Sequence, residues 1–438
     1  MTDEIEYAAE DDAFRVEIER NLRWNFVVNV LDGALFWLGL SFAAPSTILP
    51  LYVSHLTNNR ILIGLVAAIV SSGWYLPQLF TVKYVERLPV KKKLVINVGF
   101  FTERLPFILM AASVFLFAGH APTLALLFFF ATLIWRNIGA GAVAIAWQDM
   151  VAKVIPVHYR GRLLGIANFA GTAMGLVGAS LAAAILGRYP FPVNFGICMS
   201  LTALFILASW VALSLTREPP LRSNKPTVPL SEYGHRLPVV VRKDRNFATY
   251  LFSRIMAVLG YMGNGFVTVY AVRQWNLTDS QAGLYTTVFM AGQAAANLFA
   301  GALADRYGHK LVLEIGQGLS ALAMLIAVLA PSPMWMYAVF AVIGSVVAAD
   351  ILSSIMIPME FAVPDERPMY IGLANTIPGL FSAIAPLFGG WIASRGSYQT
   401  LFLTATVFSS LSWAMLHWLV KEPRNAAYGQ PDSTGITV

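Results

Sequence analysis

Twelve long apolar segments, separated by short breaks, constrain this chain more than any other feature. They lie near 24–52, 60–82, 94–118, 122–150, 163–187, 191–216, 247–272, 280–304, 311–330, 334–361, 369–393 and 398–420. A backbone surrounded by lipid must satisfy its hydrogen bonds within its own segment, and apolar segments of this length do so as α-helices. Twelve spans of about 21 residues need roughly 250 apolar positions, and 57% of the 438 residues are hydrophobic. We therefore predict an all-α integral membrane protein with twelve transmembrane helices.

The composition argues against other classes of protein. Charged residues make up 12% of the chain, about half the share of a soluble domain. The net charge is +6, but no basic face concentrates it, so a nucleic-acid partner is not expected. One cysteine, Cys198, rules out an internal disulfide framework. The six histidines have no metal-ligand spacing and there is no phosphate-binding glycine loop, so we expect no metal, no cofactor and no ATP-driven pumping.

The polar segment 217–246 divides the chain into two bundles of six predicted helices, 24–216 and 247–421. The segment 422–438 is a predicted tail. The segment 1–23 carries eight acidic residues, which is the reverse of a signal peptide. Phe14, Ile18 and Leu22 repeat every four residues, so this segment is either a short amphipathic helix or a solvated acidic tail.

The distribution of basic residues predicts the orientation of the chain. The tails, the connector and the even-numbered loops carry 23 of the 30 Lys and Arg residues. The opposite loops carry four, namely Arg60, Arg188, Arg273 and Arg395. By the positive-inside rule, both termini and the connector face the cytoplasm, in a plasma (inner) membrane.

Short repeats link the two predicted bundles. A Gly and an Asn recur at a separation of 207 residues in 163–169 and 370–376, and Lys-Leu-Val recurs at a separation of 217 residues in 93–95 and 310–312. These matches fall at equivalent places and indicate duplicated six-helix halves. Related halves with a site between them are typical of secondary transporters.

Residues 301–313, Gly-Ala-Leu-Ala-Asp-Arg-Tyr-Gly-His-Lys-Leu-Val-Leu, resemble the loop signature of the major facilitator superfamily. The matching residues are Gly301, Asp305, Arg306, Gly308 and Lys310. With the six-plus-six pattern, the resemblance covers about 24–421. It implies a monomer of two pseudo-symmetric six-helix bundles whose first, fourth, seventh and tenth helices line a central cavity.

Other family signatures are incomplete in this sequence. The equivalent loop of the first half, 83–93, lacks the glycines and has Leu88 in place of the central Asp. Residues 133–141 resemble the fourth-helix arginine motif, with the glycines one place early. Gly171, Gly175 and Gly178 resemble the antiporter motif of drug exporters without its proline, which argues mildly against a drug exporter.

The resemblance places Asp305 beside the start of the fifth helix, near Arg160 and Arg162. A carboxylate there would be stabilised by helix N-terminal amides and by guanidinium groups, which would form a cytoplasmic latch. The alternative is that Asp305 and Arg306 only anchor a loop. Two further acidic residues, Asp149 and Glu360, are expected to contact the basic residues of the cytoplasmic gate loops. These basic residues are Arg160, Arg162 and Arg367.

Ionisable residues at membrane depth are the candidates for coupling, because each costs at least ~2.5–3.5 kcal/mol at a helix centre. Asp32, Arg136 and Asp350 belong to the first, fourth and tenth predicted helices. Asn25 and Asn29 share a helical face with Asp32, and such a polar face points to a cavity or a neighbouring helix.

Asp32 and Arg136 are a possible charge pair. A nearby Arg lowers the proton affinity of a carboxylate and desolvation raises it, so a cycle that separates the two would bind and release a proton. The alternative is a static pair that fixes helix packing. Glu103 and Arg104 are expected to be structural partners of other helices.

Two further candidates, Gln78 on the second predicted helix and Asn264 on the seventh, belong to weaker polar stripes. They line a substrate path or form interhelical hydrogen bonds, and the sequence leaves both interpretations open.

These features together predict a secondary active transporter of a small molecule that works by alternating access and is driven by protons. A facilitative uniporter and a drug-type proton antiporter are the alternatives. A membrane-embedded enzyme and a non-transporting sensor are more remote, since the outer loops are short and almost uncharged. We therefore predict no enzyme activity, and the residues do not identify the substrate.

Overall fold

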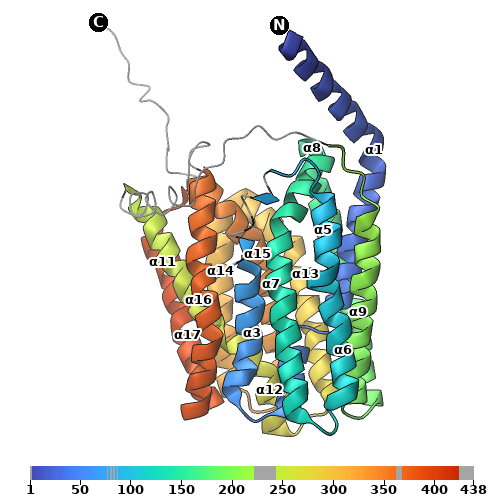
Figure 1. Ribbon diagram of the computed structural model, residues 1–438. Coiled ribbons are helices and arrows are strands. Elements are labelled where there is room, and N and C mark those ends of the chain that lie inside the picture. Colours follow the sequence, from blue (N-terminus) through green and yellow to red (C-terminus); the bar gives the residue numbers. More distant parts are fainter. Residues whose placement is uncertain are drawn as a thin grey trace, which may run out of the picture. The chain divides into compact units, whose positions relative to one another are not determined.

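The computed structural model describes residues 2–75, 77, 78, 81, 84, 85, 87–220, 243–361 and 367–423, which form helices joined by short connections (Figure 1). The chain divides into two compact units. Unit 1 comprises Met1–Thr227 and Thr268–Met290, and unit 2 comprises Val228–Val267 and Ala291–Val438. Residues 268–290 therefore belong to unit 1 although they follow the connector in sequence. The middle of the connector, 221–242, and the tail from 424 onward lie outside the described residues.

The helices before the connector all belong to unit 1. They are α1 (Thr2–Ser41), α2 (Ile48–Leu56), α3 (Arg60–Tyr75), α5 (Lys92–Gly99), the π-helix η1 (Phe100–Arg104), α6 (Leu105–Phe117), α7 (Pro122–Val154), α8 (Val157–Arg188) and α9 (Val193–Ser214).

The helices after the connector form unit 2, except for the part of α12 and α13 that joins unit 1. They are α11 (Arg245–Gly260), the 3-10 helix η2 (Tyr261–Gly263), α12 (Asn264–Trp275), α13 (Asp279–Tyr307), α14 (His309–Leu329), α15 (Met334–Phe361), α16 (Arg367–Arg395), α17 (Tyr398–Ala414) and the π-helix η3 (Met415–Leu419).

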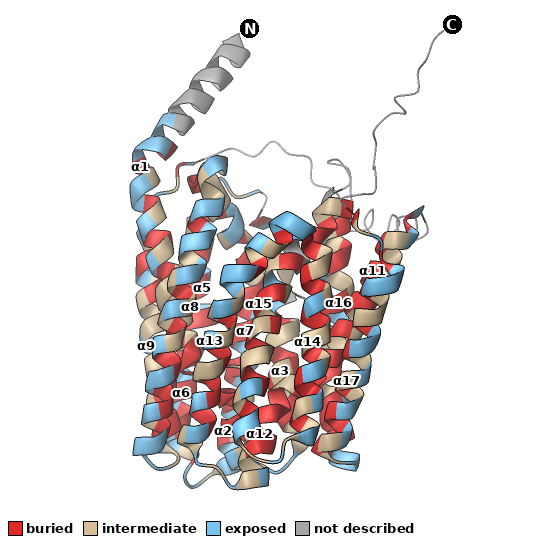
Figure 2. Cartoon of the chain, turned by 180° about the vertical axis from the view of Figure 1, so that it is seen from behind, coloured by how far each residue is buried: buried red, intermediate tan, exposed pale blue. Residues whose placement is uncertain are grey.

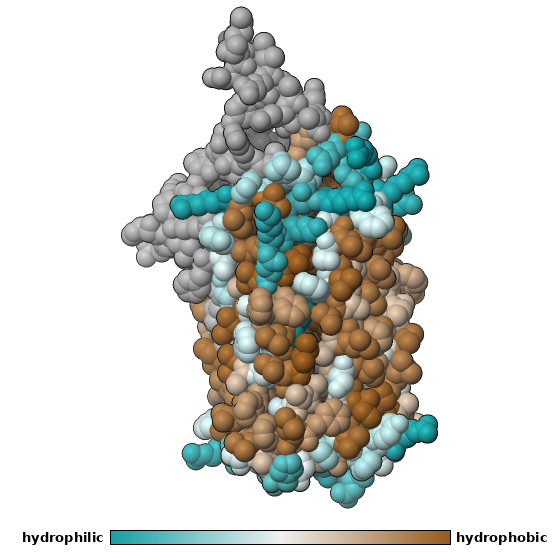
Figure 3. Space-filling model, turned by 45° about the vertical axis from the view of Figure 1, so that its right-hand side comes forward, coloured by the Kyte–Doolittle hydropathy of each residue, from teal (hydrophilic) through white to brown (hydrophobic). Residues whose placement is uncertain are grey.

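The prediction of an all-α integral membrane protein is confirmed. Among the described residues, ten helices are long and apolar enough to cross a membrane. The other two predicted spans correspond to α1 with α2 and to the shorter apolar helix α3. Along the helices in Figure 3, hydrophobic side chains cover the middle stretches and hydrophilic ones gather at the ends. The helices carry exposed as well as buried residues along their length (Figure 2), and many exposed positions are large and apolar, as contact with lipid requires.

The first predicted span, 24–52, is not one helix. α1 ends at Ser41 and α2 begins at Ile48. Pro45 lies in the break, where it removes a backbone donor and disfavours helical backbone at the residue before it. At its other end α1 extends back to Thr2, so the acidic segment is helical and continuous with the membrane helix.

Glycines allow α7 to pack unusually close to its neighbours in unit 1. A Cβ added to Gly141 would lie 2.3 Å from the carbonyl oxygen of Gly73 on α3. A Cβ added to Gly139 would lie 2.4 Å from Thr102 in η1. The glycines of the arginine-motif segment are therefore helix-contact points that fix the position of α7.

We predict that Gly141→Ala destabilises the protein by about 1–3 kcal/mol, because the added methyl group meets backbone atoms that cannot move aside. Gly165→Ala on α8 is the matched control, since its added Cβ meets no atom within 4 Å. Replacing that helical glycine is expected to be neutral or to stabilise by up to ~1 kcal/mol. Thermal unfolding of the two purified variants in the same detergent tests this contrast, and equal melting temperatures would contradict it.

Candidate functional site

The polar stripe on α1 faces the end of α9. Asn25 Nδ2 donates to the carbonyl oxygen of Arg217 at 2.9 Å, and the backbone N–H of Arg217 donates back to Asn25 Oδ1 at 2.8 Å. Asn29 Nδ2 donates to the carbonyl oxygen of Asn25 at 2.7 Å and to Thr216 Oγ1 at 3.3 Å. Of the two alternatives for this polar face, a cavity or a neighbouring helix, the contacts of Asn25 and Asn29 favour the second. They bind the start of the connector to α1.

Asp32 and Arg136 do not form the predicted direct pair. Ser209 Oγ on α9 donates to Asp32 Oδ1 at 2.5 Å. Arg136 Nη1 donates to Asn137 Oδ1 at 2.9 Å, and the guanidinium carbon lies 5.1 Å from the centre of the Phe107 ring. Both charged residues are buried, with exposed fractions of 6% and 8%, and each has neutral partners of its own.

Glu103 and Arg104 supply the charges that balance this region. The two neighbours form a buried ion pair with each other on η1, and Arg104 also donates to the carbonyl oxygen of Gly99 at 3.4 Å. Their direct polar partners therefore lie on η1 and at the end of α5. Their charges act on both Asp32 and Arg136. Two acids and two arginines thus form a charge-balanced cluster inside unit 1.

Unit 2 contains a tighter ionisable site built around Asp350 on α15. Arg254 on α11 approaches the carboxylate with both terminal nitrogens, at 2.5 Å to Oδ1 and 3.1 Å to Oδ2. Tyr261 in η2 donates its hydroxyl to Oδ1 at 3.2 Å, and Gln317 on α14 donates to that hydroxyl at 2.5 Å. Residues of α11 and η2 therefore bond the carboxylate on α15 directly, and Gln317 on α14 contacts it through the Tyr261 hydroxyl.

The two charged side chains of this site differ in exposure. The Asp350 side chain is 23% exposed and the Arg254 side chain is 8% exposed. The carboxylate is therefore partly exposed, whereas the guanidinium is enclosed. Asn264, one turn beyond Tyr261, has a buried Oδ1 atom with no hydrogen-bond partner among the described residues.

The sequence did not identify Arg254 and Gln317 as site residues, whereas Tyr261 belongs to the same weak polar stripe as Asn264. Arg254 offered one signal, because an arginine inside a lipid-spanning helix needs a partner. Gln78, which the sequence did select, donates to the carbonyl oxygen of Trp74 at 2.7 Å, within its own chain segment.

The predicted gate residues of unit 1 have partners other than those expected. Asp149 Oδ2 lies 3.1 Å from Lys91 Nζ, and not beside Arg160 or Arg162. Arg160 donates to the carbonyl oxygens of Ala152 and Ile155, so it closes the C-terminal end of α7. Arg162 is exposed.

In the signature loop, Gly308 has a φ of 97° as it begins α14, a backbone conformation that favours glycine. Gly301 does not mark a close helix contact, since an added Cβ would meet no atom within 4 Å. Arg306 lies over the ring of Tyr307 at 5.1 Å. The remaining gate candidates of unit 2 differ in burial: Asp305 is exposed, and Lys310 and Glu360 are half-buried.

The predicted contact between Asp305 and the start of α8 joins two units that are described separately, and it stays a prediction. The side chain of Arg367 lies outside the described residues.

Glu218 supplies an acid to the first-half loop that lacks the family's aspartate. Its Oε1 accepts from the backbone N–H of Lys91 at 3.0 Å, and its Oε2 accepts from that of Lys92 at 2.6 Å. Lys153 Nζ donates to Oε1 at 2.9 Å. The Glu218 side chain is fully buried. It caps the N-terminal end of α5 and, through Lys153, connects this end to α7.

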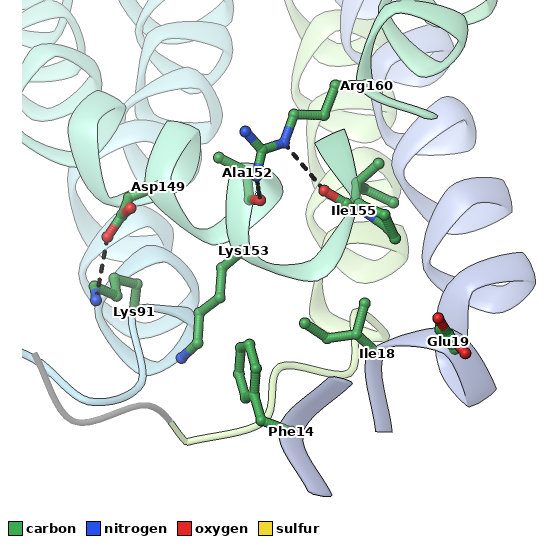
Figure 4. A pocket seen from close by; sticks show the side chains of 10 residues that line it. Phe14, Ile18, Glu19, Lys91, Asp149, Ala152, Lys153, Ile155 and Arg160 are labelled. Atoms are coloured by element: carbon green, nitrogen blue, oxygen red, sulfur yellow. Dashed lines mark hydrogen bonds and ion pairs between the residues drawn. The ribbon is translucent and has the colours of Figure 1, made fainter. Parts of the chain in front are cut away.

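A cavity of about 600 Å³ lies at this end of unit 1 (Figure 4). Its wall combines the N-terminal extension of α1 with the ends of α7 and α8, and is lined by Phe14, Ile18, Glu19, Lys91, Asp149, Ala152, Lys153, Ile155, Pro156 and Arg160. The three basic side chains in the wall all have protein acceptors. Among the described residues, no cluster of His, Cys, Asp and Glu is suited to hold a metal ion.

The fold and these buried charges define a helical integral membrane protein with ionisable residues at membrane depth. A family model described as Major Facilitator Superfamily matches residues 250–435. The multidrug resistance protein MdtL of Shigella dysenteriae serotype 1 is 28% identical over 159 residues, which cover 36% of this chain and 41% of that protein. The niacin transporter NiaP of Acinetobacter baylyi is 25% identical over 138 residues, which cover 32% of this chain and 31% of that protein. The matched stretches thus span less than half of these relatives.

Solved structures resemble the whole fold. The nucleoside transporter NupG has a TM-score of 0.63 at 14% identity, covering 90% of this chain and 98% of that chain. A bacterial homologue of the human lysosomal transporter Spinster has a TM-score of 0.61 at 16% identity, covering 90% of this chain and 96% of that chain. The second half of the chain, residues 250–435, thus matches the major facilitator superfamily, and the fold as a whole is similar to that of solved transporters.

We predict that Glu218→Gln destabilises the protein by about 3 kcal/mol, because it leaves the Lys153 ammonium without its buried counter-charge. The double variant Glu218→Gln with Lys153→Met is expected to recover most of that loss. Asp149→Asn is the comparison, since the Asp149 side chain is 51% exposed and exposed ion pairs contribute about 1 kcal/mol or less. Chemical or thermal unfolding of the wild type, the single variants Glu218→Gln, Lys153→Met and Asp149→Asn, and the double variant measures these differences, and additive effects of the Glu218 and Lys153 changes would contradict the pairing.

Proposed function

We propose that this protein is a secondary active transporter that moves a small molecule by alternating access, with protons as the coupling ion. The match of residues 250–435 to the major facilitator superfamily supports the general activity. The names of the matched relatives, a multidrug resistance protein and a niacin transporter, support a small-molecule substrate. The proposal places the protein in a plasma (inner) membrane with both termini cytoplasmic, which rests on the distribution of basic residues.

The observation that carries the coupling proposal is the partly exposed carboxylate of Asp350, held by an enclosed arginine. An ion pair inside a membrane helix is costly unless both charges are present and paired. A proton that binds Asp350 cancels its charge and weakens the two bonds from Arg254. The release of Arg254 would loosen α11 from α15, so protonation and helix rearrangement are linked at one residue.

Asp32 and Arg136 remain candidates for a second role in this cycle. They lie in a cluster whose charges already balance, and Asp32 is more enclosed than Asp350. We propose that Asp350 exchanges the proton and that the Asp32 cluster holds α1 against α9. Asn264, with its unpaired buried oxygen near Tyr261, is a candidate to bind a polar group of the substrate.

The coupling is tested with the full chain in proteoliposomes under an inward or outward pH gradient. Ethidium, niacin and a nucleoside are the probes, chosen from the names of the relatives and of the similar structure, after a thermal-shift screen for binding. Asp350→Asn is expected to reduce gradient-driven accumulation at least ten-fold, because the amide cannot gain and lose a proton. Exchange of labelled for unlabelled substrate without a gradient is expected to persist.

Glu314→Gln is the matched control for that measurement. Glu314 is another membrane-helix acid of unit 2, and it pairs with His417 at 2.6 Å, away from Asp350. This variant is expected to keep accumulation within about two-fold of the wild type. Unchanged accumulation in Asp350→Asn, or transport by the wild type that ignores the gradient, would remove the coupling proposal and favour a facilitative uniporter.

We predict that Asp32→Asn retains at least half of the gradient-driven accumulation, because the new amide oxygen can still accept from Ser209. The same proteoliposome assay measures it. A well-folded Asp32→Asn protein that has lost accumulation would move the proton site from α15 to α1.

Drug-type proton antiport is the second candidate, and the match to MdtL favours it. The test uses vesicles with an outward-directed ethidium gradient and an opposing proton gradient. Extrusion of ethidium from these vesicles would distinguish proton antiport from proton-driven uptake. Niacin accumulation in the direction of proton entry would instead indicate symport.

A further inference from the structure

One carboxylate joins three helices of unit 1 at the end opposite the connector. Asp279, the first residue of α13, lies with Oδ1 2.8 Å from Nε2 of His55 near the end of α2. Its Oδ2 accepts from Asn194 Nδ2, near the start of α9, at 3.0 Å. Both carboxylate oxygens are therefore engaged, one of them by a titratable ring.

Aromatic rings fix the orientation of His55. The imidazole stacks on Phe191 with ring centres 4.8 Å apart and planes 14° from parallel. Phe195 approaches it edge-on at 5.4 Å. The His55 side chain is 31% exposed, so its ring contacts Asp279 and also remains reachable by water and protons.

Further contacts continue along α13. We call the closely packed contact of α12 and α13 with α2, α8 and α9 the seam. Thr47, which precedes α2, shares a 2.6 Å hydrogen bond with Thr286 on α13, and both side chains are fully buried. A Cβ added to Gly283 would lie 2.6 Å from the Cα of Ala183 on α8. These contacts join helices from before the connector to a helix from after it, all within unit 1.

Arg273 on α12 adds a second polar contact to the seam. Its Nη2 donates to Asn58 Oδ1 at 3.1 Å and to the carbonyl oxygen of Thr57 at 3.4 Å. The loop that receives it follows α2 directly. Within the described part of the chain, Asp279 is the charged group that contacts the His55 ring. Arg273 binds Thr57 and Asn58, two and three residues after His55 in the chain. The ring also contacts Phe191 and Phe195, which carry no charge.

We propose that His55 and Asp279 form a proton-sensitive latch that holds this seam closed on the external side of the membrane. The assignment of the side comes from the distribution of basic residues, and the inference rests on the alternating-access function proposed above. An imidazole changes charge in the mildly acidic to neutral range. A protonated ring donates a charge-assisted hydrogen bond to the carboxylate, which is stronger than the neutral bond.

A protonated His55 ring completes the ion pair with Asp279, which holds the seam closed. A neutral ring makes a weaker contact with the carboxylate, so the seam would open more often as the external pH rises. Protons outside therefore act on the gate itself, separately from any proton that travels with the substrate.

The test uses a buried reporter in the seam. Thr286→Cys is made in a Cys198→Ser background, which removes the chain's one native cysteine. A membrane-impermeant maleimide is applied to right-side-out vesicles between pH 5.5 and 8. Each rate is divided by that of Gln274→Cys, an exposed position on α12, to cancel the pH dependence of thiol reactivity.

The relative labelling rate is expected to rise about five-fold from pH 5.5 to 8, the change that one partly exposed ion pair produces. In His55→Gln, which keeps a hydrogen-bonding group without a titratable one, the rate is expected to be high and independent of pH. Asn194→Ala is the matched control. It removes a neutral contact to the same carboxylate, so labelling should be faster at every pH with the five-fold rise retained.

Two results would overturn the latch, and they have different meanings. The first result is that the cysteine is labelled, but His55→Gln shows the same pH dependence as the wild type, or the wild type shows none. Either outcome removes the role of His55 and leaves alternating access intact. A reporter that stays unreactive at every pH, in the wild type and in His55→Gln, shows that the seam does not open. That result removes the latch together with the alternating-access function on which it rests.

Discussion

A charge placed inside a membrane helix must have a partner of opposite sign, and this constraint organises both units of the protein. Lipid offers no water to solvate an isolated carboxylate or guanidinium, so an unpaired one costs several kcal/mol. In unit 1, Glu103 and Arg104 pair with each other and balance the nearby Asp32 and Arg136. In unit 2, Arg254 encloses one side of Asp350. The sites most interesting for function are therefore also the sites where helix packing depends on charge.

The sequence predicted the class of fold because hydrophobic length is a local property. A stretch of about 20 apolar residues is helical in lipid whatever its neighbours are, and the described helices follow the predicted spans closely. The exceptions have local causes that were present in the sequence. Pro45 separates α1 from α2, and the acidic segment before residue 24 continues as helix, one of the two alternatives that its four-residue periodicity left open.

The partners within each site were harder to predict because they are distant in sequence and follow no period. Asp350 and Arg254 lie 96 residues apart, and Glu218 reaches the backbone of Lys91 across 127 residues. Periodicity did place Asn25, Asn29 and Asp32 on one face of α1, but it could not say which helix that face meets. The structure directs the face toward α9, so the stripe joins neighbouring helices, one of the two alternatives that the pattern left open.

The length of α1 has a mechanical consequence. Its 40 residues extend for about 60 Å at 1.5 Å per residue, roughly twice the thickness of the hydrocarbon core. The helix is unbroken from Thr2 to Ser41, and before Asn25 its residues Phe14 and Ile18 line a pocket together with the ends of α7 and α8. A tilt of α1 within the bilayer would therefore also change the shape of that pocket.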